Sequence, residues 1–211
     1  MKKIMFNDRY GLTEAVLSGR KTQTRRIVPR NFFTCSYDIL DNNTLVFEDM
    51  YGDWHDIRKA AYALKAGEVV AVAQKYSDVA QGCYPVDSRY DAFRTANWGD
   101  GEDGALKSSA GWNNKLFVRA DLMPHHIRIT NVRVERLQDI SDSDIKAEGI
   151  DYVNGYSESY FFGFGVKIDK GWIKLGNTPR EAYAALIDRI SDKGTWESNP
   201  YVFVYDFELV D

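Results

Sequence analysis

The sequence of 211 residues is poor in cysteine, histidine and proline, with two, three and five of each. Cys35 and Cys83 form no spaced framework and have no neighbours of metal-ligand type, which predicts reduced thiols and no metal centre. His125 and His126 also lack cysteines or acids at ligand spacing. No apolar run reaches the length of a membrane span, and the N-terminus has no signal-like apolar region. We therefore expect a cytoplasmic protein that needs no membrane and no metal.

A strong overall charge is absent as well. The formal net charge of −4 argues against a general binder of polyanions, although it leaves room for a local basic groove. Positions 20–30 are such a stretch, because they contain no acid and carry Arg20, Lys21, Arg25, Arg26 and Arg30. The alternative is that these side chains are simply a solvated polar face.

Glycine-rich loops that cradle phosphates are also missing. Gly163 and Gly165 alternate with phenylalanines, and we expect them to mark a bend in an aromatic strand or loop. No cofactor is therefore predicted.

Periodicity predicts short strands with a few helices, which is the α+β class. Strands are expected over 22–28, 68–73, 127–137 and 201–209, with a bulge or bend near Thr130-Asn131 in the third. Helices are expected near 11–18, 142–148 and 179–190. The last two have capping signals at Ser141 and at Thr178-Pro179. A hairpin is expected over 32–49, with its turn at 41–43. We predict one domain over 1–211, with insertions at about 30–64, 77–115 and 151–177.

Four segments carry a resemblance to a known family. They are Leu17–Arg26, close to a Gly-x-Lys-x-x-Thr-x-Arg signature; Tyr62–Glu68; Met123-Pro124 with Val132–Ile150; and Trp196 with Asn199-Pro200. Together they cover about half of the chain and resemble the ASCH domain of the PUA-like superfamily, in particular the longer ASCH proteins of phages and prophages. The resemblance implies a small β-barrel surrounded by helices. One departure is the run Ala71–Tyr76, where relatives tend to have a Trp-Val-Arg-Glu-like run.

The resemblance also implies a function. Small bacterial ASCH proteins that are similar at the signature remove the acyl group of acetylcytidine with a lysine, a threonine and a glutamate, without a metal. By position, these residues are Lys21, Thr24 and Glu148, and we expect Arg20, Arg25 and Arg26 to bind substrate. The partner would be a nucleoside-like small molecule. The alternative is a PUA-like module that binds RNA without catalysis, with a ribonuclease as a third reading; the oligomeric state is left open.

The residues themselves set conditions on this chemistry. Lys21 and Thr24 would point to opposite faces of a regular strand, so they converge only if the chain turns between them, and Gly19 favours a tight turn there. Otherwise Thr24 is an ordinary strand residue and Lys21 is solvated. Glu148 stands near a helix C-terminus, a poor place for an acid, which indicates a functional reason for its presence. We predict a cleft between positions 19–26 and 140–150, lined by Arg20, Lys21, Thr24, Arg26 and Glu148.

Overall fold

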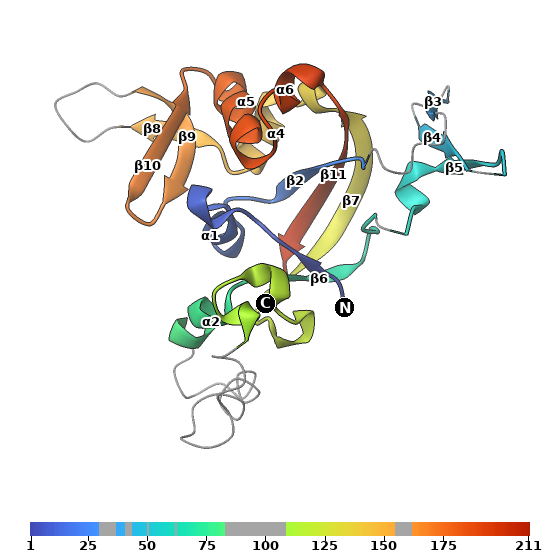
Figure 1. Ribbon diagram of the computed structural model, residues 1–211. Helices are drawn as coiled ribbons and strands as arrows, with labels where there is room; N and C mark the ends of the chain where they lie inside the picture. Colours follow the sequence, from blue (N-terminus) through green and yellow to red (C-terminus); the bar gives the residue numbers. More distant parts are fainter. Residues whose placement is uncertain (30–36, 41–43, 50, 62, 83–108, 155–161) are drawn as a thin grey trace.

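The computed structural model describes residues 1–29, 37–40, 44–49, 51–61, 63–82, 109–154 and 162–211. Its centre is a five-stranded sheet of order β1-β6-β7-β11-β2 (Figure 1). Strands β1 (Lys3–Ile4) and β6 (Val69–Val72) pair in parallel. The other neighbours are antiparallel: β6 with β7 (His126–Arg136), β7 with β11 (Tyr201–Leu209), and β11 with β2 (Gln23–Ile27).

The long strands β7 and β11 form the middle of this sheet. Asp206 pairs with Asn131 and Phe207 pairs with Ile129, so Thr130 is an extra residue in the ladder. The register change predicted from the sequence is therefore a β-bulge, which bends a strand. Four consecutive residues of β11, from Val202 to Tyr205, are buried, because both faces of this central strand are covered.

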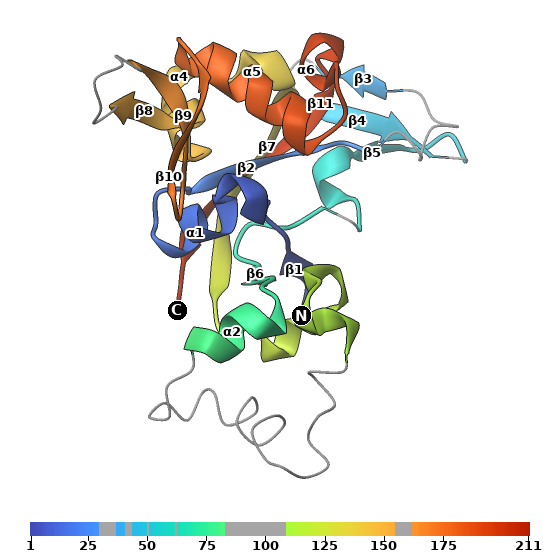
Figure 2. The same cartoon turned by 60° about the vertical axis from the view of Figure 1, so that its left-hand side comes forward.

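Helices gather at two ends of the sheet. Figures 1 and 2 show α4 (Asp142–Ala147), α5 (Pro179–Ile190) and α6 (Thr195–Ser198) together at one end, and α2 (Tyr76–Gly82) at the other. The predicted caps are present: the Ser141 and Thr178 hydroxyls each accept a hydrogen bond from the N–H three residues later, at 3.2 Å. Helix α1 covers Leu12–Leu17, and short 3₁₀ turns cover Asp8–Tyr10, Ile57–Lys59, Ala110–Trp112, Lys115–Phe117, Ala120–Leu122 and Leu137–Asp139.

Two smaller antiparallel sheets flank the central one. The first consists of β3 (Tyr37–Ile39), β4 (Leu45–Glu48) and β5 (Trp54–Asp56), which agrees with the predicted hairpin, although its turn at 41–43 lies outside the described residues. The second consists of β8 (Asp151–Asn154), β9 (Phe162–Ile168) and β10 (Gly171–Gly176). The sequence predicts 151–177 only as an insertion without assigned strands, so it does not predict this sheet. Residues 83–108, which make up most of the predicted insertion at 77–115, lie outside the described residues.

The α+β class is confirmed, but the described strands do not close into a barrel. The open edges of the central sheet are β1 and β2, which are not hydrogen-bonded to each other. Strand β1 is only two residues long, so little backbone is available to complete a ladder. A side chain crosses the gap instead, since Arg26 Nη2 donates to the carbonyl oxygen of Met5 at 2.5 Å. We call this gap, between Met5–Arg9 and β2, the seam.

The buried apolar side chains form two clusters. The larger one joins the central sheet to α1, α4 and α5, and the smaller one lies around α2, with Ala71, Ala73, Tyr76, Val79, Val118 and Met123. Within the described part of the chain, no helix has the length and apolar character needed to cross a membrane.

Candidate functional site

A buried ion pair joins the two segments that the sequence had singled out. Lys21 is 2% exposed and Glu148 is 5% exposed. Lys21 Nζ donates to carboxylate oxygen Oε2 of Glu148 and, at 2.9 Å, to the backbone carbonyl oxygen of the same residue. Lysine and glutamate are almost never fully buried unless they are paired, so this contact accounts for the burial of both.

The local backbone explains how Lys21 reaches this position. Gly19 has a φ of 71°, which turns the chain after α1. The Lys21 N–H then donates to the carbonyl of Ala15 at 2.8 Å, and the Thr22 N–H donates to that of Ala147 at 2.9 Å. Strand β2 begins only at Gln23. Lys21 therefore lies outside the regular strand, and the strict alternation of side chains along β2 does not fix it on the face opposite to Thr24.

The environment of Lys21 changes its proton affinity. Burial lowers the pKa of its ammonium group, because the charged form loses water. Glu148 acts in the opposite direction, through its charge and its hydrogen bond, while the charges of Arg26 and Arg25 lower the pKa further. The net result is a lysine that gives up its proton more readily than a free one.

Arg25 holds the other oxygen of the Glu148 carboxylate. Its side chain is 1% exposed, and its Nη1 lies 3.3 Å from Glu148 Oε1. Its Nη2 lies 2.7 Å from Glu135 Oε1 and 3.1 Å from Asp144 Oδ2. Nη1 also donates to the side-chain oxygen of Gln23. Since its donors are used within the protein, Arg25 orients Glu148 rather than standing free for a ligand.

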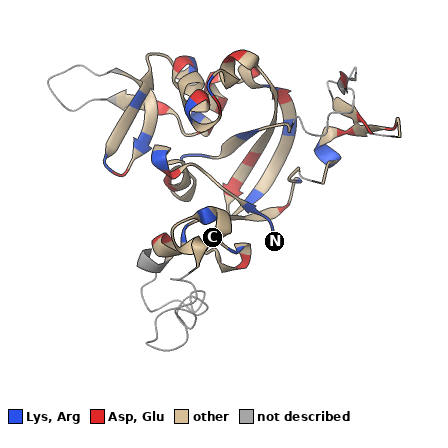
Figure 3. Ribbon diagram, viewed as in Figure 1, with Lys and Arg blue, Asp and Glu red and all other residues tan. Residues whose placement is uncertain are grey.

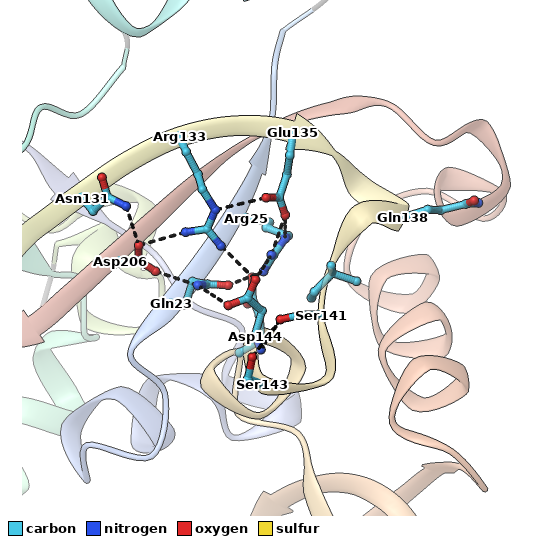
Figure 4. Close-up of polar contacts among 12 residues, drawn as sticks. Gln23, Arg25, Asn131, Arg133, Glu135, Gln138, Ser141, Ser143, Asp144 and Asp206 are labelled. Atoms are coloured by element: carbon cyan, nitrogen blue, oxygen red, sulfur yellow. Dashed lines mark hydrogen bonds and ion pairs between the residues drawn. The ribbon is translucent and has the colours of Figure 1, made fainter. Parts of the chain in front are cut away.

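A wider polar network continues from Arg25 across the sheet (Figure 4). Arg133 lies 2.9 Å from both Asp144 Oδ2 and Asp206 Oδ2, and 3.1 Å from Glu135 Oε2. Gln23 Nε2 donates to Asp144 Oδ1 at 3.0 Å and to Asp206 Oδ1 at 2.6 Å. The residues come from β2, β7, β11 and α4, so the network fixes α4, and with it Glu148, against the sheet.

The ion pair lies in the wall of a cavity of about 580 Å³. Thr24, Arg25, Arg26 and Ile27 all line it. Because four consecutive residues of β2 and the residues Met5–Arg9 line it, the cavity lies along the free edge of this strand, beside the seam. Apolar side chains of α5 form the opposite wall, namely Tyr183, Leu186, Ile187 and Ile190.

Most of the predicted site residues meet here. Lys21, Thr24, Arg25, Arg26 and Glu148 line one cavity. Arg20 does not line it, because the turn at Gly19 directs its side chain to the Ser18 hydroxyl, which accepts from Arg20 Nε at 3.0 Å. Thr24 lines the cavity and is nearly buried, at 4% exposure for the residue.

Sequence reasoning missed other lining residues, among them Asp8, Arg9, Lys115 and Tyr183. The Tyr183 hydroxyl is buried and has no hydrogen-bond partner among the described residues, although Arg25 is close enough to lower its pKa. Burial and the charge of Glu148 outweigh Arg25 and raise the pKa of Tyr183 well above its ordinary value. The apolar face of α5 is predicted from the sequence to be buried, but no sequence pattern distinguishes the wall of a cavity from the ordinary core.

No three His, Cys, Asp or Glu side chains in the described ranges are placed to hold a metal ion. Comparison of the chain with models of protein families, with curated proteins and with solved structures finds no match. The functional argument therefore depends on the cavity itself and on the residues that line it.

Proposed function

We propose that the protein is an amidohydrolase that removes the acyl group from an acylated nucleoside or nucleobase such as acetylcytidine, using Lys21, Thr24 and Glu148 without a metal. The observation that carries the proposal is the buried Lys21–Glu148 pair in the wall of a cavity that Thr24 also lines. The resemblance of the Leu17–Arg26 and Val132–Ile150 segments to ASCH amidohydrolases supports the same three roles.

The first step forms a covalent bond. The Thr24 oxygen attacks the amide carbonyl carbon, and its proton passes to the neutral Lys21 amine. A threonine hydroxyl needs such a base nearby, and the lowered pKa of Lys21 makes the neutral amine more accessible.

The second step breaks the carbon–nitrogen bond. The proton taken by Lys21 moves along its hydrogen bond to Glu148 and from there to the departing amine. Water then attacks the acyl–threonine ester while Lys21 accepts one of its protons. As the ester C–O bond breaks, Lys21 passes that proton to the departing Thr24 oxygen, and the second water proton stays on the carboxyl group. The sum is amide plus water giving amine plus carboxylic acid. Arg25 keeps Glu148 in position throughout.

The alternative of an RNA-binding module is less well supported. The cavity volume lies in the range usual for small-molecule sites, and its wall along α5 is apolar rather than basic. A groove for single-stranded RNA would instead need a basic track with aromatic side chains open for base stacking.

The test is to incubate the purified protein with acetylcytidine and other acylated cytidines and to follow the deacylated product by chromatography. Lys21→Ala, Thr24→Ala and Glu148→Gln should each lower kcat by about a thousandfold or more, and double variants should be little worse than single ones. Thr24→Ser should retain part of the activity, because it keeps a hydroxyl. If Thr24→Ala turned over acetylcytidine as fast as the parent, the nucleophile assignment would be wrong.

A further inference from the structure

The cavity is more basic than the protein that contains it. Its lining includes five cationic side chains, from Arg9, Lys21, Arg25, Arg26 and Lys115, against two acidic ones, from Asp8 and Glu148. The whole chain has a net charge of −4, and the described acidic and basic residues are interspersed along the ribbon (Figure 3). The positive surplus is therefore a local feature of this site.

Three of the five cations are neutralised by the protein. Lys115 Nζ lies 2.7 Å from Asp8 Oδ1, and Lys21 is paired with Glu148. Arg25 is held by Glu148 and by two carboxylates outside the cavity lining, Glu135 and Asp144.

Arg9 and Arg26 are the remaining two, and neither has an acid within ion-pair distance among the described residues. The Arg26 guanidinium lies 5.6 Å from the ring centre of Phe6 and donates to the carbonyl of Met5, which fixes its place at the seam. Arg9 lies 5.7 Å from the ring centre of Tyr10. An arginine has five N–H donors, so both retain donors for a further partner.

We propose that Arg9 and Arg26 form a subsite for a phosphate group of the ligand. This rests on the proposed function and names its substrate class: an acylated nucleotide rather than a nucleoside. Two unpaired guanidinium charges match a phosphomonoester, which carries about −1.5 to −2 charges at neutral pH, and the planar fork of arginine suits phosphate oxygens. Both residues are exposed, so the attraction is screened by salt and is strongest at low ionic strength.

The experiment compares acetylcytidine with acetylcytidine 5′-monophosphate at low ionic strength. We expect kcat/KM to be at least tenfold higher for the monophosphate, mainly through KM. In Arg9→Gln and Arg26→Gln the ratio of kcat/KM for the monophosphate to kcat/KM for acetylcytidine should fall toward one. Arg26→Lys should also lower this ratio strongly, because lysine keeps the charge but not the planar set of N–H donors. Arg189→Gln is the matched control: Arg189 is an exposed cation of α5 outside the lining, and its loss should leave the ratio unchanged.

Calorimetry with cytidine and cytidine 5′-monophosphate separates this inference from the proposed function. If no acyl compound is hydrolysed but the monophosphate binds more tightly than cytidine, and Arg9→Gln and Arg26→Gln remove the difference, the subsite stands and the amidohydrolase proposal fails. If acetylcytidine is hydrolysed but the phosphate improves neither binding nor kcat/KM, the subsite is overturned and the function stands. A dinucleotide tests the source of the phosphate, since a subsite for free nucleotides should favour the monophosphate over the phosphodiester.

Discussion

At the scale of single residues, the buried pair is asymmetric. Glu148 contacts two cations, Lys21 and Arg25, whereas Lys21 has one acid. Glu148→Gln should therefore cost on the order of 3 kcal/mol in the free energy of unfolding, because it leaves a buried ammonium without an acid. Lys21→Met should cost far less, since Glu148 keeps Arg25. Urea unfolding at pH 7 measures both, and equal losses would contradict the asymmetry.

The same asymmetry has a pH dependence. In Glu148→Gln, burial lowers the pKa of Lys21 without the opposing effect of the carboxylate. Between this lowered pKa and the unfolded value of about 10.4, the unfolded state binds more protons than the folded state. The stability of the variant should therefore rise with pH through that window, more steeply than that of the parent.

Asp144 allows a prediction in the acid range. Burial raises the pKa of its carboxyl group, but Gln23, Arg133 and Arg25 outweigh burial, and the net shift is downward. Its contribution to stability is present above the unfolded pKa of about 3.9 and is lost as the pH falls through the lower folded value. Asp144→Asn should lower the free energy of unfolding by about 1–3 kcal/mol at pH 7. Its free energy of unfolding should also fall less than that of the parent as the pH is lowered into the acid range. Asp142→Asn, an exposed neighbour in the same helix, is the control; urea titrations from pH 7 to 2.5 compare the two.

Sequence reasoning reached the pair but not its surroundings. Lys21, Thr24 and Glu148 came from a resemblance, and the poor position of Glu148 at a helix end supported its choice. The structure supplies the reason for that position, since Glu148 follows α4 as its C-cap and meets Lys21 and Arg25 there. Arg20 was chosen for its charge alone, and charge does not report the direction of a side chain after a turn.

At the scale of elements, the cap of α5 can be tested directly. The Thr178 hydroxyl accepts from the Glu181 N–H, and Pro179 begins the helix. Thr178→Ala should lower the free energy of unfolding by about 1 kcal/mol, whereas Thr178→Ser should lower it much less, because it keeps the accepting oxygen. A similar loss of unfolding free energy in both variants would show that the hydroxyl does not stabilise the start of α5. The cap also matters for the site, because α5 forms a wall of the cavity.

Elements with strong local signals were predictable and those with weak ones were not. The strands of the central sheet from 69 onward and the helices α4 and α5 have apolar periodicity or capping residues, and all lie within a few residues of their predicted bounds. Strand β9 contains Gly163 and Gly165, which weaken strand propensity. The reason for glycine is clear only from the strand pairing, because a Cβ on Gly165 would lie 1.9 Å from the carbonyl oxygen of Ile173 in β10. Such a close approach is a long-range property that no local pattern reveals.

At the scale of the whole molecule, the cavity lies beside the seam. The cavity takes its lining from Met5–Arg9, from β2, from Lys115, from Glu148 and from α5. A closed barrel would have filled this gap with a backbone ladder between β1 and β2. The cavity therefore lies at the place where the central sheet departs from the predicted barrel.

The distribution of charge over the molecule predicts how it treats long nucleic acid. The net charge is −4, and the two cavity cations without an acid partner among the described residues, Arg9 and Arg26, lie in one cavity rather than along a track. A single-stranded RNA of about 20 nucleotides should therefore bind no more tightly than a mononucleotide, because few of its phosphates meet a cation and few counterions are released. Fluorescence anisotropy with labelled RNA, between 50 and 200 mM salt, measures this. Tight binding that weakened steeply with salt would instead favour the RNA-binding module, since only contacts with many phosphates produce such a slope.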